Sequence, residues 1–259
     1  MAAMDTKPRP RPAFATPSAA TRHSTGGVRR QPHSGCDSCL SRHLAICASL
    51  PASETHALEA AAGEMALDAG STLAHEGSAR REVYTVTRGM LRRVRLLPDG
   101  RRLVAGFLME GDFIGFSGAP EYRHTIEAIT DSTLCVFSMS NMRQLCERFP
   151  QLESGMLAQA CVELDATRAS LMMLGRMGPA ERLAGFLVDM AERQRRRGGE
   201  AQHVDLPMTR ADIADHLGLT IETVSRSFTK LRQSGAIAFD DPRRIDLVDL
   251  PALRTAAGL

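Results

Sequence analysis

The residues from Thr209 to Arg232, TRADIADHLGLTIETVSRSFTKLR, constrain the fold more than any other part of the sequence. Thr209 is a residue type that caps helix N-termini, and Gly218 can adopt the left-handed conformation that ends a helix. Between them, apolar residues recur at helical spacing: Ile213, Ala214 and Leu217. We therefore expect a first helix that stops at Gly218, with Leu219 buried in the turn that follows.

A second helix is expected to begin after Thr220, which serves as its N-cap. One stripe of this helix is apolar: Ile221, Val224, Phe228 and Leu231. The opposite stripe carries Glu222, Ser225 and Arg226, which project together at helical spacing. Arginine suits the O6 and N7 acceptors of guanine, and glutamate accepts from the N4 amine of cytosine. The stretch predicts a DNA-binding helix-turn-helix; the alternative is a helical hairpin whose exposed charges are only solvated.

Length and charge limit the remaining possibilities. At 259 residues the chain is long enough for two modest domains. Its formal charge is only +2, so affinity for DNA must come from a local patch. No apolar run is long enough to span a bilayer, and the N-terminus lacks the apolar core of a secretory signal. We therefore expect a cytoplasmic protein with no membrane partner.

The N-terminal part combines a polar tail with crowded cysteines. Residues 1–35 are rich in Pro, Arg, Ser and Thr, so we expect a disordered tail, in which Met4 is an alternative start to Met1. Six cysteines in a chain without a secretion signal indicate reduced thiols, and hence metal or redox chemistry. Three of them form a Cys-x2-Cys-x7-Cys arrangement: Cys36, Cys39 and Cys47.

After these cysteines, the pattern of apolar, polar and turn-forming residues changes several times along the chain. Residues 36–65 are expected to hold the cysteine-rich segment and a short helix from Pro51 to Met65. Alternating segments separated by glycine and by a Pro98-Asp99-Gly100 turn predict a β-roll (jelly roll) over residues 66–139. Ser140 is expected to cap a helix that Pro150 ends or interrupts.

Residues 140–177 are expected to connect the β-roll to the helix-turn-helix and to pair two copies of the chain. The long helical pattern from Gln151 to Met177 has a heptad-like seam: Leu157, Leu164, Leu171 and Leu174. Such a seam is best buried against its twin in a homodimer, although it could pack only on its own β-roll. Residues 178–259, with a helix opened by Pro179 and a hairpin of Ala236–Phe239 with Arg244–Val248, predict a winged helix-turn-helix domain.

This order of elements resembles the CRP/FNR family of bacterial transcription regulators. The resemblance covers nearly everything after residue 35 and is most specific in the helix-turn-helix. It implies an α+β fold with an N-terminal cyclic-nucleotide-binding-like β-roll, and a regulator rather than an enzyme. The matching motifs are Tyr84-x-Val86-x-x-Gly89, Glu110-Gly111-Asp112-Phe113-x-Gly115, Glu181-Arg182-Leu183-Ala184, and Leu206-Pro207-Met208-Thr209-Arg210 running into Leu217-Gly218-Leu219-Thr220-x-Glu222-Thr223-Val224-Ser225-Arg226.

Two departures within the resemblance indicate the branch of the family. Cyclic-nucleotide-binding members hold the phosphate with an Arg followed by Ser or Thr. Here Arg123 is followed by His124, so no cyclic nucleotide is expected. Those members usually also carry an Arg just before the Glu of the second helix, whereas this chain has Ile221, which suits a thymine methyl. Both departures resemble the FNR branch.

Oxygen sensors of the FNR type bind a [4Fe–4S] cluster through three N-terminal cysteines and one from the β-roll. Cys36, Cys39 and Cys47 match the first three, and thiolate is the ligand that such clusters need. The gap before Cys47 is longer than in the enteric sensors and suits a longer-spaced subgroup. Cys135 is the best match by position for the fourth ligand.

Other interpretations of the same residues remain open. A zinc site could use the Cys-x2-Cys pair with His33 or His43, although solvated histidines are the simpler interpretation. A regulator without a cluster would be controlled by its abundance or by thiol oxidation. A β-roll metalloenzyme would need converging histidines, but His75-Glu76 is adjacent and so points to opposite faces of a strand. Two further cysteines match no ligand and are expected to be small buried hydrophobes: Cys146 and Cys161.

The resemblance implies an oxygen-responsive activator of anaerobic and microaerobic genes, which binds a TTGAT-N4-ATCAA-like palindrome as a homodimer and contacts RNA polymerase. Arg226 is expected on guanine and Glu222 on the cytosine side. Other residues are expected at neighbouring A·T pairs or at phosphates: Ile221, Ser225, Thr209, Arg210, Thr220 and Thr223.

Overall fold

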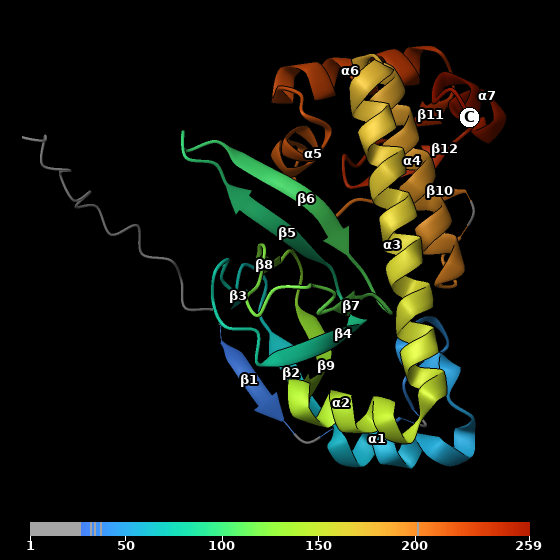
Figure 1. Cartoon of the computed structure of the whole chain (residues 1–259). Helices are drawn as coiled ribbons and strands as arrows, with labels where there is room; N and C mark the ends of the chain where they lie inside the picture. The colour runs from blue at the N-terminus through green and yellow to red at the C-terminus, as the bar shows by residue number, and fades with distance from the viewer. Residues whose placement is uncertain (1–26, 32, 34, 37, 201) are drawn as a thin grey trace, which may run out of the picture.

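The computed structural model describes residues 27–259, except residues 32, 34, 37 and 201. A β-roll and a helical C-terminal domain lie side by side, and one long helix runs past both of them (Figure 1). The expected α+β class is therefore confirmed. Within the described residues, no helix is both long and apolar enough to cross a membrane.

The β-roll consists of two antiparallel sheets around an apolar core. One sheet has the strand order β1-β2-β9-β4-β7, and the other has the order β3-β8-β5-β6. Alternate side chains point inward, so Val86, Leu91 and Leu134 are almost fully buried between the sheets. The strands are β1 Val28–Gln31, β2 Gly63–Leu67, β3 Thr72–Ala74, β4 Glu82–Arg88, β5 Leu91–Leu96, β6 Arg102–Leu108, β7 Phe113–Ile114, β8 Thr125–Ala128 and β9 Ser132–Ser138.

The N-terminal boundary differs from the sequence-based expectation. Residues 28–31, expected in a disordered tail, form β1, which pairs antiparallel with β2 at the edge of the sheet. The backbone N–H of Gly27 and the guanidinium of Arg29 both donate to the Asp68 carboxylate, at 2.8 and 3.0 Å. Composition alone does not reveal a strand that depends on a distant partner. The rest of the expected tail, residues 1–26, 32 and 34, lies outside the described residues.

The helices around the β-roll are also shifted from their expected limits. The first, α1, spans only Thr55–Ala61, because β2 already begins at Gly63. Ser138 rather than Ser140 caps α2 (Met139–Arg148), with its hydroxyl accepting from the Asn141 N–H at 3.0 Å. As expected, Pro150 interrupts the helical run and begins α3 (Pro150–Arg176).

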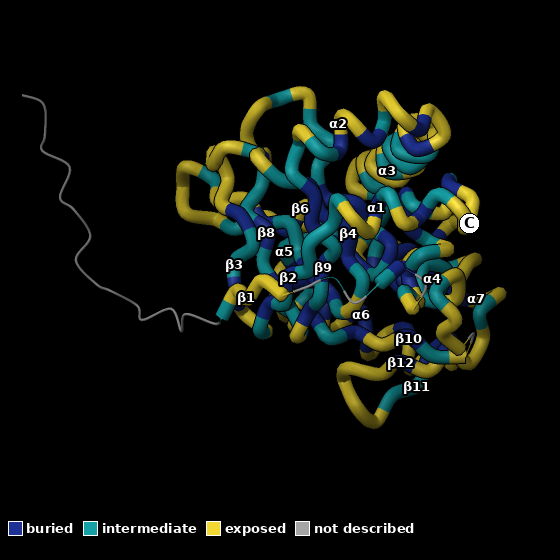
Figure 2. Tube along the Cα trace, turned by 90° about the horizontal axis from the view of Figure 1, so that it is seen from below, coloured by how far each residue is buried: buried dark blue, intermediate teal, exposed yellow. Residues whose placement is uncertain are grey.

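Helix α3 carries an apolar seam that no other part of the described chain covers fully. Its apolar side chains are between 39% and 69% exposed: Leu157, Val162, Leu164, Leu171, Met172 and Leu174. Apart from Leu152, every residue of α3 is exposed or half-buried, and the turns of α3 that are visible in Figure 2 have these two colours. A seam of this kind is stabilised by burial against the same helix of a second copy. The expectation that the helix packs only on its own β-roll therefore does not fit its exposure.

The C-terminal domain surrounds α4 (Pro179–Arg196) and contains the expected helix-turn-helix. Thr209 caps α5 (Arg210–Leu217), Gly218 ends it with φ of +63°, and Thr220 caps α6 (Ile221–Gln233). Three strands form the wing in the order β10-β12-β11: β10 His203–Asp205, β11 Ile237–Ala238 and β12 Arg244–Leu247. A final helix that the sequence did not predict, α7 (Leu250–Ala256), packs against α4.

One guanidinium joins the end of α3 to the helix-turn-helix. Arg182 on α4 donates to the carbonyls of Leu174 and Met177 at 2.9 Å, and to the carbonyl of Leu217 at 3.1 Å. These carbonyls lie at the C-termini of α3 and α5, where the helices leave acceptors without intrahelical partners. A cation placed there also interacts favourably with both helix dipoles.

We predict that Arg182→Ala lowers the free energy of unfolding by roughly 3 kcal/mol, because three carbonyls lose a charged donor at once. Urea denaturation followed by circular dichroism measures the loss. The matched control is Arg101→Ala, since Arg101 is exposed, lies outside α3 and pairs with Asp99 in its own turn. Equal stability of the two variants would contradict the assignment.

The α3 seam also makes a prediction about Cys161. In a parallel pair of α3 helices, Cys161 follows Leu157 by four residues and precedes Leu164 by three, so it lies in the seam beside its own copy. Mild oxidation should therefore give a covalent dimer on a non-reducing gel, and Cys161→Ser should abolish it. The variant Leu164→Glu should weaken the dimer in sedimentation experiments. A covalent dimer that persists in Cys161→Ser would contradict this arrangement.

Candidate DNA-binding face and cysteine site

The exposed face of α6 presents the residues expected to contact bases. Glu222, Ser225 and Arg226 are all exposed, whereas Val224 and Phe228 are buried against α4 and α5. Hydrogen bonds from its own backbone N–H and from Thr220 hold the pKa of the Glu222 carboxyl below its usual range. Glu222 is therefore an ionised acceptor at neutral pH, as a contact to a cytosine amine requires.

The first turn of α6 differs from the expectation in one respect. Ile221 is 48% exposed and so lies on the surface rather than in the buried stripe. That exposure suits its expected contact with a thymine methyl. Thr220 accepts from the Thr223 N–H at 3.2 Å, and Ser225 donates to the Ile221 carbonyl at 2.9 Å. The hydroxyls of Thr220 and Ser225 are thus at the surface but locally hydrogen-bonded.

Two residues at the start of the first helix of the motif, Thr209 and Arg210, were expected to contact phosphates, and they lie in different environments. Thr209 is exposed, and its hydroxyl both accepts from the Asp212 N–H and donates to the Asp212 carboxylate. Arg210, by contrast, lies with its guanidinium carbon 3.3 Å from the centroid of the Phe228 ring and donates to the Pro242 carbonyl. Burial lowers the pKa of Arg210 to about 10. Arg210 therefore links α5, α6 and the wing in this structure, and its contact with a phosphate stays a prediction.

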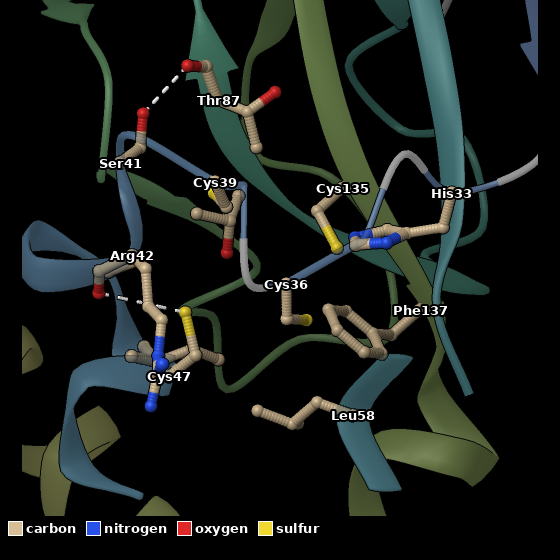
Figure 3. Close-up of a pocket in the computed structure, with 13 residues that line it drawn as sticks. His33, Cys36, Cys39, Ser41, Arg42, Cys47, Leu58, Thr87, Cys135 and Phe137 are labelled. Carbon is tan, nitrogen blue, oxygen red and sulfur yellow. Dashed lines mark hydrogen bonds between the residues drawn. The ribbon is translucent and has the colours of Figure 1, made fainter. Parts of the chain in front are cut away.

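Four cysteines line one small cavity beside the β-roll (Figure 3). Cys36 and Cys39 come from the turns that follow β1, Cys47 from a short 3-10 helix (Ile46–Ser49), and Cys135 from β9. The cavity is closed by apolar and polar neighbours that include Leu58, Phe137 and the ring of His33. The loop is fixed to the sheet by the Ser41 hydroxyl, which donates to the Thr87 carbonyl at 2.7 Å.

The residue type at this site suits an iron–sulfur cluster, because thiolate is the ligand that such clusters need, whereas the present size of the cavity does not. Burial, assisted by the neighbouring cysteines, raises the pKa of Cys47 to about 11 and raises that of Cys135 further. Thiolates in such a place need a cation, which the irons of a cluster would supply. The cavity itself is about 30 Å³, room for about one water. A [4Fe–4S] cluster would therefore require the Cys36–Cys47 loop to lie farther from β9.

The other two cysteines lie outside this cavity, and the two histidines considered as zinc ligands differ in their surroundings. Cys146 is half-buried on α2 with its thiol 3.7 Å from the Met156 sulfur, and Cys161 is exposed on α3 of the single chain. His43 is exposed, whereas His33 lies in the cysteine cavity and accepts from the Gly35 N–H at 3.0 Å. No three His, Cys, Asp or Glu side chains in the described part of the chain are arranged to hold one metal ion.

A second and larger cavity, about 260 Å³, lies inside the β-roll next to α3. Its lining includes Arg80, Arg93, Arg123 and His124. Arg80 donates to three carbonyls, those of Gly115, Ser117 and Ala119, at 2.7 to 3.0 Å. Its guanidinium is thus committed to holding the surrounding loop.

The β-roll and the winged domain share ion pairs that the sequence did not reveal. Arg92 on β5 and Arg102 on β6 both contact the Asp212 carboxylate at 2.7 Å, and Arg102 also contacts Asp215 at 2.8 Å. Arg193 on α4 and Arg197, which directly follows α4, contact Asp112 at 2.7 and 2.8 Å. The partners are distant in sequence, so only the folded chain brings them together.

Comparison with known proteins agrees with this architecture. Residues 64–149 match the model of the cyclic nucleotide-binding domain, and residues 181–256 match the Crp-like helix-turn-helix domain. The first match covers β2 to α2, that is the β-roll and the helix that follows it, and the second covers most of the winged domain.

Several transcription regulators match along most of their length. The nitrogen fixation regulation protein FixK of Bradyrhizobium diazoefficiens is 38% identical over 82% of this chain and 92% of its own. The transcriptional activator protein FnrL of Cereibacter sphaeroides is 32% identical over 86% of this chain and 92% of its own. The solved structure of FixK2 from Bradyrhizobium japonicum has a TM-score of 0.70 at 32% identity, over 75% of this chain and 96% of that chain.

The fold, the exposed face of α6 and these likenesses define a transcription regulator with a sensor-type β-roll. The chain belongs to the CRP/FNR family of DNA-binding transcription activators, whose members act as dimers. The matching proteins and folds are regulators rather than enzymes, which rules against the β-roll metalloenzyme.

We predict that Arg226→Gln weakens binding to operator DNA by about 1–3 kcal/mol, because a bidentate contact to guanine is lost. Fluorescence anisotropy with a labelled operator measures the loss. The same substitution should cost little on an operator whose contacted guanine is replaced, since the contact is then already missing. Gln233→Ala, at the far end of α6, is the control and should bind both operators like the wild type. An equal penalty on both operators would contradict the assignment.

Proposed function

We propose that this regulator senses oxygen through a [4Fe–4S] cluster held by Cys36, Cys39, Cys47 and Cys135. The observation that supports the proposal is the convergence of four thiols, from the N-terminal loop and from β9, on one cavity. When bound, the cluster supplies chemistry that oxygen attacks, so its loss can report the presence of oxygen. The function is activation of anaerobic and microaerobic genes, in the cytoplasm, through contacts with RNA polymerase.

The loop that carries the cysteines also contacts the dimerisation helix. Gln159 on α3 donates to the Leu44 carbonyl at 3.0 Å, between Cys39 and Cys47 in the chain. A side chain at Gly155 would come within 2.8 Å of Ser49, so loop and helix are packed closely there. A displacement of the loop is therefore transmitted directly to the first half of α3, and through α3 to the dimer.

The DNA target proposed for the dimer is a palindrome close to TTGAT-N4-ATCAA. Its half-sites would be contacted by two copies of α6, one helical turn apart in the major groove. Arg226 is assigned to guanine, Glu222 to the cytosine side, and Ser225 with Ile221 to neighbouring A·T pairs. Thr209, Thr220 and Thr223 lie near the helix N-termini that would face phosphates.

Cyclic nucleotide is not part of the proposed mechanism, although the β-roll matches the cyclic nucleotide-binding domain. Arg123 is exposed at the rim of the large cavity and is followed by His124 instead of Ser or Thr. Arg80 is already bonded to three carbonyls. Arg123 thus lacks the adjacent Ser or Thr with which an arginine holds the cyclic phosphate in cyclic-nucleotide-binding members.

A second candidate function keeps the DNA binding and replaces the cluster by zinc or by thiol oxidation. Three N-terminal thiols in a regulator of this architecture favour the cluster over zinc. No described group of side chains is arranged for a single ion. Thiol oxidation would be favoured if the protein bound DNA equally well with and without iron.

The test is anaerobic purification with iron, sulfide and zinc analysis and a visible spectrum. We predict about four iron and four sulfide per protomer, and loss of both on exposure to air. Zinc in place of iron, or a colourless protein, would contradict the cluster.

Cysteine variants then connect the cluster to DNA binding. Cys39→Ser should lose iron and anaerobic operator binding together. The matched control is Cys146→Ser, because Cys146 is a half-buried thiol outside the cysteine cavity. If Cys39→Ser bound the operator like the wild type, regulation by the cluster would be excluded.

A further inference from the structure

A buried carboxylate connects the β-roll to the first helix of the helix-turn-helix. Asp212 is 1% exposed, and its Oδ1 accepts from Arg92 on β5 and Arg102 on β6, each at 2.7 Å. Its Oδ2 accepts from the N–H and the hydroxyl of Thr209, at 3.0 and 2.8 Å. We call Arg92, Arg102, Asp212 and Asp215 the Asp212 clamp. One carboxylate thus caps α5 and anchors it to the other domain.

The arginines of the clamp are themselves held in place. Arg92 is oriented by Glu127 on β8, whose Oε2 accepts from its Nε and lies 2.8 Å from its second guanidinium nitrogen. Arg102 divides its contacts between Asp212 and Asp215. A partly buried ion pair whose members have further hydrogen-bond partners keeps its side chains in one orientation. A single exposed ion pair does so less well and contributes little to stability.

Strand β5 reaches the dimerisation helix as well. Successive side chains of a strand point to opposite faces, and Arg93, next to Arg92, forms an ion pair with Glu163 on α3. The strand therefore joins α5 through Arg92 and α3 through Arg93. Strand β5 thus connects α3 to the helix-turn-helix. This connection is separate from the contacts that Arg182 makes at the end of α3.

The clamp is compatible with DNA binding. With the clamp formed, Glu222 and Arg226 remain exposed on α6, so the β-roll does not cover the face that contacts bases. Asp212 lies next to Thr209, where a phosphate is expected, and an unpaired carboxylate there would repel that phosphate. The two arginines neutralise this charge and leave the exposed Thr209 hydroxyl at the surface.

We propose that Arg92 and Arg102 are positioning residues for DNA recognition: through Asp212 they fix the orientation of the helix-turn-helix relative to α3. In a dimer, this fixes the distance between the two recognition helices. Binding then depends sharply on the spacing of the half-sites. The inference concerns the same DNA-binding site and rests on the palindrome proposed above.

The experiment compares operator spacers in the full-length protein, prepared anaerobically with iron and sulfide. Anisotropy is measured on TTGAT-N4-ATCAA and on the same half-sites separated by five or six base pairs. The variant Arg92→Gln/Arg102→Gln should bind the N4 operator about tenfold more weakly, a loss of roughly 1.4 kcal/mol. It should also discriminate less between the spacers than the wild type does, because its two helix-turn-helix units are no longer held at one separation.

Two further variants separate positioning from a general loss of structure. Arg92→Lys/Arg102→Lys keeps both charges and should restore most of the spacer discrimination. Arg101→Gln is the matched control, since Arg101 precedes Arg102 but is exposed and pairs with Asp99 in its own turn. It should behave as the wild type. The single variant Arg102→Gln gives an intermediate result if the double variant does not fold.

Each alternative outcome overturns a specific statement. Wild-type affinity and spacer discrimination in Arg92→Gln/Arg102→Gln would exclude a positioning role. Tighter binding would make the clamp an inhibitory contact, and loss of the dimer in sedimentation would place its effect on α3. If the wild type itself showed no preference for the N4 spacer, the proposed palindrome would fail, independently of any difference between the variants.

Discussion

The burial of α4 is the constraint on which the rest of the structure depends. Its apolar side chains, among them Leu183, Phe186 and Leu187, are almost fully buried in a core that also contains Val104 and Phe107 of the β-roll. Burying each large side chain contributes about 1.5–3 kcal/mol, so the two domains share a substantial core rather than only a surface contact. Charged groups at its border must then be paired, because unpaired buried charges are strongly destabilising. The Asp112 and Asp212 ion pairs follow from this.

Because the two domains share a core, the cysteine site is connected to the helix-turn-helix through packed elements and not through a flexible linker. The cysteine loop contacts the start of α3 through Leu44 and Gln159, while the end of α3 contacts α4 and α5 through Arg182. One rigid helix therefore lies between the cysteine site and the helix-turn-helix, with its apolar seam exposed along its length. In the proposed function, a change at the cysteines alters how two α3 helices pair, and the pairing sets where the recognition helices lie.

Much of this architecture could be predicted from local patterns. The caps at Thr209 and Thr220, the turn at Gly218 and the interruption of the helical run at Pro150 follow from short-range chemistry, and the structure confirms them. Strand β1 could not be predicted, because its stability comes from pairing with β2 more than thirty residues away.

The inward position of Arg210 was missed for a similar reason. A residue at the start of an exposed helix is expected at the surface, yet the Phe228 ring lies within reach of its guanidinium. The pairing of Arg92 and Arg102 with Asp212 likewise joins residues more than a hundred positions apart. Sequence patterns located the exposed polar residues of α6 and the cysteines that line one cavity, but not the contacts that hold them in place.

The central claim is that the cysteine site controls the pairing of α3. Sedimentation velocity, with the visible iron–sulfur absorbance and the protein absorbance recorded in the same run, tests it most directly. Under anaerobic conditions both signals should sediment as a dimer, and after exposure to air the visible signal should disappear while the protein sediments as a monomer. A dimer that persists unchanged after the iron–sulfur absorbance is lost would contradict the claim.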